Sequence, residues 1–153
     1  MLKRLKTIGM GSKKQQRNKY NNKKHIAIYT EKPTKGICVD GSCRGNPNGK
    51  IAFKIYRIET NEVLMTKDCL TGTNNHAEYF GLCKAIQMFP NEVIYSDSYI
   101  AINWVKQRTH RSKYPHVALE QCVNFLQKLE SLPDIRKWET KLWGENPADF
   151  GYK

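Results

Sequence analysis

Residues 36–42 carry the sequence G-I-C-V-D-G-S, a short apolar run that ends in an acidic residue and two turn-forming residues. This pattern predicts a β-strand that ends in a turn, and the residues that follow, R-G-N-P-N-G at 44–49, are almost all turn formers. Residues 51–58 alternate as a second strand and residues 62–70 as a third, with the hairpin turn at 59–61. The first half of the chain is therefore predicted to be an antiparallel meander.

The second half has helical and strand patterns in alternation. T-N-N at 73–75 offers helix caps to a stretch with helical spacing that ends before Pro90. The later expected elements are a strand at 93–95, helices at 98–106 and 117–129, and a last strand at 137–142. The order βββαβααβ predicts an α/β fold with a five-stranded mixed sheet flanked by helices.

Charge divides the chain into two parts. Its 153 residues suit one domain, and 26 Lys and Arg against 14 Asp and Glu give a net charge of +12. Residues 1–35 hold 11 of the basic residues and only one acid, Glu31. We expect a disordered basic arm over 1–25 and a folded domain over 26–153, with an anionic partner such as nucleic acid. A charged leader without a role and an organellar targeting peptide are the alternatives for the arm.

The composition also argues against several classes of protein. Apolar runs reach only four or five residues, far short of the roughly 20 that span a bilayer, so neither a membrane protein nor secretory cargo is expected. The five cysteines are odd in number and lack C-x-x-C spacing, which disfavours a zinc site or a disulfide framework. We expect a cytoplasmic chain with reduced thiols, and a monomer.

Four carboxylates lie at the ends of predicted elements: Asp40 after the first strand, Asp97 after the fourth, Glu78 early in the first helix and Asp149 in a Pro-Ala-Asp turn. Strand-end residues on neighbouring strands meet at one edge of a sheet. Two carboxylates 4 Å apart repel by about 4 kcal/mol at an effective dielectric of about 20, so a convergent group needs cations. Oxygen ligands select Mg²⁺ or Mn²⁺, and two such ions suit hydrolysis at phosphorus. Taken singly, Asp40 and Asp97 are better explained as turn caps and Glu78 as a surface residue, and Asp149 could bond its own backbone; the set of four favours the site.

The set of motifs resembles the type 1 ribonuclease H family. The matching stretches are I-C-V-D-G-S-C-R-G-N-P at 37–47, G-T-N-N-H-A-E-Y-F-G-L at 72–82, I-Y-S-D-S at 94–98 and N-P-A-D at 146–149. The resemblance implies a metal-dependent endonuclease that hydrolyses the RNA strand of RNA/DNA hybrids with two Mg²⁺ ions, leaving 3′-hydroxyl and 5′-phosphate ends. It further implies that Asp40 bridges both ions, that Asp149 holds the ion that activates water, and that Glu78 and Asp97 hold the other.

The resemblance also implies a set of residues that bind the hybrid. The asparagines would reach the minor groove, Gly45 would let the backbone approach, Thr73 would contact a DNA phosphate, and Trp104 would lie along the DNA-side groove. Turn and cap duty is the alternative for the asparagines, and core packing is the alternative for the tryptophan. The predicted substrate-binding residues are Gly45, Asn46, Thr73, Asn74, Asn75 and Trp104.

Two features differ from the usual family pattern. The segment W-G-E-N-P-A-D at 143–149 has no His before the last aspartate, so we expect that Glu145 partly replaces it or that turnover is slower. Four residues follow Asp149 in this sequence, so we do not expect the helix that often comes next in the family. The basic arm is expected to add salt-sensitive affinity in place of a folded hybrid-binding module.

Three other functions remain open on the sequence. A 3′–5′ exonuclease or a junction-cutting nuclease would also use clustered acids. A non-catalytic nucleic-acid-binding protein would keep the fold without turnover, although retained acids near a phosphate groove would weaken such binding. A fragment of a reverse transcriptase is the third alternative.

Overall fold

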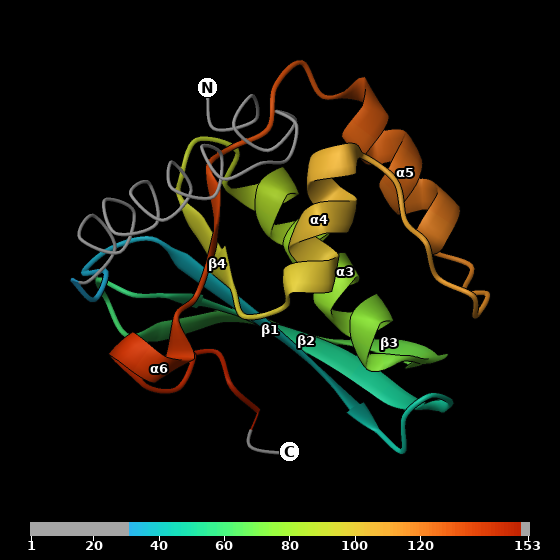
Figure 1. Cartoon of the computed structure of the whole chain (residues 1–153), viewed down its shortest axis with the longest axis horizontal. Helices are drawn as coiled ribbons and strands as arrows, with labels where there is room; N and C mark the ends of the chain where they lie inside the picture. The colour runs from blue at the N-terminus through green and yellow to red at the C-terminus, as the bar shows by residue number, and fades with distance from the viewer. Residues whose placement is uncertain (1–30, 151–153) are drawn as a thin grey trace, which may run out of the picture. The chain divides into compact units, whose positions relative to one another are not determined.

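A computed structural model describes residues 31–150 of the chain (Figure 1). The folded unit begins at Pro33. The expected arm over 1–25, and residues 26–30 of the expected domain, lie outside the described residues. Within the described part, no helix is long and apolar enough to cross a membrane.

The predicted βββαβααβ order is confirmed, with one short helix added near the end. The elements are β1 Ile37–Arg44, β2 Gly49–Arg57, β3 Glu62–Gly72, α3 Asn74–Met88, β4 Ile94–Ser96, α4 Tyr99–Gln107, α5 Leu119–Lys128, β5 Ile135–Lys137 and α6 Thr140–Trp143. The five strands form one sheet in the order β3-β2-β1-β4-β5. Pairs β1–β2 and β2–β3 are antiparallel, whereas β1–β4 and β4–β5 are parallel, so the sheet is mixed as expected.

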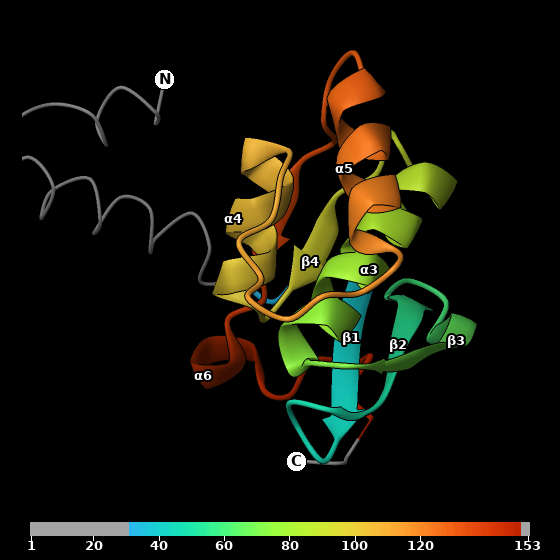
Figure 2. The ribbon, with the colours of Figure 1, turned by 90° about the vertical axis from the view of Figure 1, so that its right-hand side faces the viewer.

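One face of the sheet carries the main hydrophobic core. Because side chains alternate along a strand, Val39 and Gly41 of β1 point to the same face, which α3 covers. A methyl group at Gly81 of α3 would lie 2.6 Å from Cγ1 of Val39, so this glycine lets the helix lie close against the strand. Helices α4 and α5 also pack against α3 on this side, and α4 contacts β5 as well (Figures 1 and 2).

The other face carries a smaller aromatic cluster. Tyr95 of β4 meets the rings of Trp138 and Trp143 edge-on at centroid distances of 6.0 and 6.2 Å, and the two tryptophans lie 5.1 Å apart. Helix α6 lies on this side of the sheet, away from α3 and α5 (Figure 1). On this second face, the aromatic cluster therefore covers the β4–β5 side of the sheet.

Two predicted elements were placed wrongly. Strand β1 does not end in a turn at residue 42 but continues to Arg44, because its antiparallel pairing with β2 extends to the Arg44–Lys50 pair. The last strand is Ile135–Lys137 rather than 137–142, and residues 140–143 are helical. The backbone turns here because Trp138 is fully buried and Trp143 must fold back onto it.

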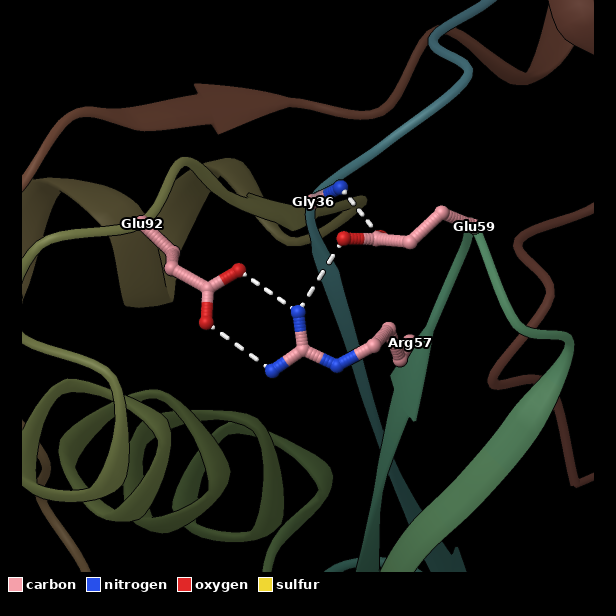
Figure 3. Close-up of polar contacts among 4 residues, drawn as sticks. All are labelled: Gly36, Arg57, Glu59 and Glu92. Atoms are coloured by element: carbon pink, nitrogen blue, oxygen red, sulfur yellow. Dashed lines mark hydrogen bonds and ion pairs between the residues drawn. The ribbon is translucent and has the colours of Figure 1, made fainter.

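A polar cluster joins three segments at the start of β1 (Figure 3). The Arg57 guanidinium donates to both carboxylate oxygens of Glu92, at 2.7 and 2.9 Å, and to Glu59 at 3.1 Å. Glu59 also accepts the Gly36 N–H at 3.0 Å. The hydrogen bonds to Glu92 raise the pKa of Arg57 above its ordinary value. The cluster ties the end of β2 to the loop before β4 and to the residue before β1.

Candidate active site

Three of the four predicted acids meet at one place. Asp40, Glu78 and Asp97 each offer a carboxylate oxygen, and these oxygens all lie within 4.8 Å of one another. Asp40 is completely buried and Glu78 is 3% exposed, while Asp97 is half-buried. The residues come from a strand, a helix and a strand–helix junction that are far apart in the sequence.

The parallel pairing of β1 with β4 brings the two aspartates together. Val39 pairs with Ser96, so Asp40 and Asp97 each follow directly after a paired residue. Strand β4 ends at this point, and Ser98 caps α4 by accepting the Ala101 N–H at 3.1 Å. Asp97 is thus fixed in the one-residue step between the strand and the helix cap, whereas Asp40 lies within β1 and not at its end as predicted.

Glu78 reaches the site because Gly41 has no side chain. Ile37 donates its N–H toward β4, and alternation points the Gly41 N–H the same way, beyond the end of β4. Oε1 of Glu78 accepts this N–H at 2.6 Å. A methyl group at Gly41 would lie 2.4 Å from the Glu78 nitrogen, which is closer than atoms can approach. The Asp-Gly pair therefore supplies both a carboxylate and the space for a second one.

The start of α3 is fixed by a capping box with a histidine in the third helical position. Thr73 accepts the His76 N–H at 3.1 Å, and Nδ1 of His76 accepts the Thr73 N–H at 3.1 Å. Nε2 of His76 lies 2.7 Å from the Ser112 hydroxyl and 3.1 Å from the Tyr114 carbonyl. Burial, followed by the neighbouring His116, lowers the pKa of His76. The neutral imidazole thus joins the first turn of α3 to the loop between α4 and α5.

The charge and chemistry of the three acids fit a hard divalent cation. Carboxylates 4.8 Å apart repel by about 3.5 kcal/mol per pair at an effective dielectric of about 20. Burial of two of the three raises the cost of leaving them without a counter-charge. All donors are oxygens, which Mg²⁺ and Mn²⁺ prefer over soft metals.

Asp149, the fourth predicted acid, is not part of the group of three but lies on an adjacent turn. Asn146 is 3% exposed, and its Nδ2 donates to the carbonyl of Val39 at 2.9 Å. Oδ1 of Asn146 accepts the Ala148 N–H, and its carbonyl accepts the Asp149 N–H, both at 2.9 Å. The turn that carries Asp149 is thereby attached to the residue before Asp40.

Two of the predicted hybrid-binding loops contact one another. Oδ1 of Asn46 accepts the Asn74 N–H at 2.9 Å, so the loop after β1 rests on the first turn of α3. Gly45 has a φ of +89° and, like Asn46, is exposed, while Asn74 and Asn75 are half-exposed. The contact gives Asn46 a capping role beside any role toward substrate.

The remaining predicted binding residues are more buried. Thr73 is 7% exposed because its hydroxyl caps α3. Trp104 is also 7% exposed and packs edge-on against Tyr79 at 5.4 Å, between α3 and α4. Trp104 is therefore surrounded as a core residue is. Core packing was the alternative to a place along the DNA-side groove.

Sequence reasoning missed two residues next to the acids. Asn146 directly precedes Pro147, and an Asn at such a place is typical of a turn that the side chain stabilises, which was the one local signal for its role. Lys54 was not singled out, but it pairs with Asp40 across β1 and β2. The only feature of the sequence that indicates this pairing is the length of the hairpin loop, because that length fixes the register of β1 and β2.

Comparison with known proteins agrees with these features. The sequence matches the family model of RNase H over residues 32–141. Among solved structures, the chain is similar to RNase H1 of the halophilic archaeon Halobacterium salinarum NRC-1, with 18% identity, a TM-score of 0.48 and coverage of 67% of this chain and 81% of that chain. It is also similar to LC11-RNase H1 isolated from compost by a metagenomic approach, with 20% identity, a TM-score of 0.48 and coverage of 69% and 84%.

A third similar structure is the N-terminal RNase H domain of a Mycobacterium tuberculosis protein, solved as a fusion with maltose-binding protein. The identity is 23%, the TM-score is 0.43, and the match covers 67% of this chain and 86% of that chain. The family assignment depends on the sequence match, which spans more than two thirds of the chain. The chain therefore belongs to the ribonuclease H family of hydrolases, which cleave the RNA strand of RNA/DNA hybrids and generally use divalent metal ions.

Proposed function

We propose that this chain is an endonuclease that hydrolyses the RNA strand of RNA/DNA hybrids with two Mg²⁺ ions and leaves 3′-hydroxyl and 5′-phosphate ends. The observation that carries the proposal is the approach of Asp40, Glu78 and Asp97 to within 4.8 Å of one another in a largely buried site. Bound ions would supply activation of the attacking water and stabilisation of the leaving oxygen. Mn²⁺ offers the same oxygen-ligand chemistry and is the expected substitute.

Each acid has a distinct task in this proposal. Asp40 would hold both ions, and Glu78 and Asp97 would hold the ion on the leaving side. Asp149, on its turn attached to Val39, would hold the ion on the side of the attacking water. The Gly41 N–H fixes one oxygen of Glu78, so this carboxylate needs little reorganisation to act as a ligand.

The hybrid would bind next to the acids through short polar groups. Asn46 and Asn74 lie next to each other, and we propose that they and Asn75 form hydrogen bonds in the wide minor groove of a hybrid. Thr73 accepts a backbone N–H and still has its own O–H to donate to a phosphate oxygen. We infer no contact for Trp104, because its ring lies in the core. We further propose that the chain acts as a monomer.

The proposal is tested by the products of cleavage. An RNA/DNA hybrid with both RNA ends blocked is incubated with the chain and Mg²⁺, and the new ends are examined. We expect internal cuts whose 3′ ends are extended by a polymerase without phosphatase treatment and whose 5′ ends are ligated directly. Cleavage that requires a free end would favour an exonuclease, and binding without cuts in Mg²⁺ or Mn²⁺ would favour a non-catalytic hybrid-binding protein.

A further inference from the structure

Lys54 lies on the same face of the sheet as Asp40 and directly beside it. The two residues are paired across β1 and β2, and residues directly opposite in an antiparallel pair point to the same side. Lys54 is half-buried. A basic side chain at this place is thus close to the acids without being one of the groups that would hold a metal.

The ammonium group of Lys54 contacts the end of the described chain. Its Nζ donates to the carbonyl of Asp149 at 3.4 Å and lies 4.7 Å from the centre of the Phe150 ring. The first contact is a hydrogen bond and the second is a cation–π interaction. Both act on residues 149 and 150, and neither involves the Asp149 carboxylate.

The segment that carries Asp149 is therefore held on both sides of β1. Asn146 binds the carbonyl of Val39 on the side where β4 has ended, and Lys54 reaches from β2 on the other side. The first attachment is at Asn146 and the second is at the Asp149 carbonyl, so the segment between them crosses β1 near Asp40. Only one of the two attachments uses a charged group.

We propose that Lys54 is a positioning residue that holds the Asp149 carboxylate in place for metal binding by anchoring the backbone of residues 149 and 150. The inference rests on the proposed function, because the metal is bound by the acids named there. Lys54 has two opposing effects: its positive charge alone would weaken the binding of a nearby cation, whereas its anchoring of Asp149 would strengthen it. Whether substitution of Lys54 raises or lowers the Mg²⁺ concentration needed for cleavage therefore distinguishes the two effects.

The test compares Lys54→Met, which keeps the unbranched apolar stem but removes the ammonium group, with Lys54→Arg, which keeps the charge. Lys67→Met on β3 is the control, since Lys67 is exposed and paired with Phe53, not with the acids. The first measurement is the exchange rate of the Asp149 amide hydrogen in metal-free protein. The second is the Mg²⁺ concentration that gives half-maximal cleavage of an RNA/DNA hybrid.

We expect Lys54→Met to speed exchange at the Asp149 amide and to raise the Mg²⁺ midpoint by about 10-fold. Lys54→Arg should restore most of both values, and Lys67→Met should change neither. A midpoint that falls or stays the same in Lys54→Met overturns the proposal, even if exchange becomes faster. If Lys54→Met does not fold, Phe150→Leu removes the cation–π contact and should shift both values in the same direction.

Failure of the proposed function is visible separately. If the unsubstituted chain cleaves no hybrid, the metal midpoint is lost as a measurement and the proposed function fails. Amide exchange then decides whether Lys54 anchors this segment, and equal rates in Lys54→Met and the unsubstituted chain overturn the anchoring as well.

Discussion

Gly41 is a residue at which a single methyl group should disturb the candidate site. Its added Cβ would lie 2.4 Å from the Glu78 nitrogen and 2.5 Å from the Ala77 carbonyl carbon, both of them backbone atoms that cannot rotate away. We expect Gly41→Ala to lower the free energy of unfolding by about 1–3 kcal/mol, because α3 must move off β1. The rate of hybrid cleavage should also fall, and by more than the loss of folded protein explains, because Glu78 would move with the helix.

Urea denaturation and cleavage assays of Gly41→Ala check this prediction. Glu78→Gln is the matched comparison, because it removes the carboxylate charge and leaves the helix contact unchanged. Stability and activity equal to those of the unsubstituted chain would show that α3 does not depend on the absence of a side chain at this position.

Tyr79 offers a second test at the scale of one residue. Its ring is fully buried, and within residues 31–150 its hydroxyl has no hydrogen-bond partner. Burial raises the pKa of this phenol far above its ordinary value, so the group stays neutral. Because an unsatisfied buried hydroxyl is costly, Tyr79→Phe should raise the free energy of unfolding by about 1 kcal/mol.

The control for this prediction is Tyr56→Phe. The Tyr56 hydroxyl is satisfied, since it donates to Oδ1 of Asn61 at 3.0 Å, so its removal should leave stability unchanged or slightly reduced. Thermal denaturation of both variants checks the contrast. A large loss of stability in Tyr79→Phe would mean that the hydroxyl forms a stabilising hydrogen bond in the folded protein.

At the scale of elements, the cap of α3 should make stability depend on pH. His76 is held neutral by its environment, with a pKa lowered below that of the unfolded chain, about 6.5. The unfolded state therefore binds more protons than the folded state below that pH. The stabilising contribution is complete above about pH 6.5 and is lost as the pH falls toward the folded-state pKa, by at most about 1.4 kcal/mol per pH unit.

His76→Gln tests this dependence, because Gln at the same helical position closes a capping box without titrating. Urea denaturation at pH 7.5 and 5.5 should show a larger loss for the unsubstituted chain than for His76→Gln. The other histidines of the chain are the same in both proteins, so the difference between the two pH profiles reports on position 76. Equal losses in the two proteins would contradict the role given to His76.

The sequence predicts those elements whose pattern of apolar residues follows directly from which side chains are buried against the sheet. The meander and α3 follow alternation, turn residues and the Thr73 cap, and all of these are local signals. The last strand was misplaced because residues 137–142 are arranged by contacts outside the segment. Trp138 donates its indole N–H to the Gly144 carbonyl and packs on Tyr95, and such tertiary contacts override a local strand pattern.

At the scale of the whole molecule, the site is assembled from four segments that the sheet order brings together. The strand order made the meeting of Asp40 and Asp97 predictable, and a helix after β3 was enough to suggest Glu78. The anchors of Asp149 were not predictable in this way. Asn146 binds a backbone carbonyl, and Lys54 depends on the register of a hairpin, so neither has a signature in the linear pattern.

In the proposed function, the carboxylates of Asp40, Glu78, Asp97 and Asp149 bind the metal ions with which the chain cuts hybrids. The most direct test is cleavage of a labelled, end-blocked RNA/DNA hybrid beside duplex DNA and duplex RNA, with Mg²⁺ or EDTA, by the unsubstituted chain and by Asp40→Asn. We predict that only the RNA of the hybrid is cut, and that both EDTA and Asp40→Asn abolish cutting. Cleavage that persists in Asp40→Asn or in EDTA would contradict catalysis by metal ions bound to these carboxylates.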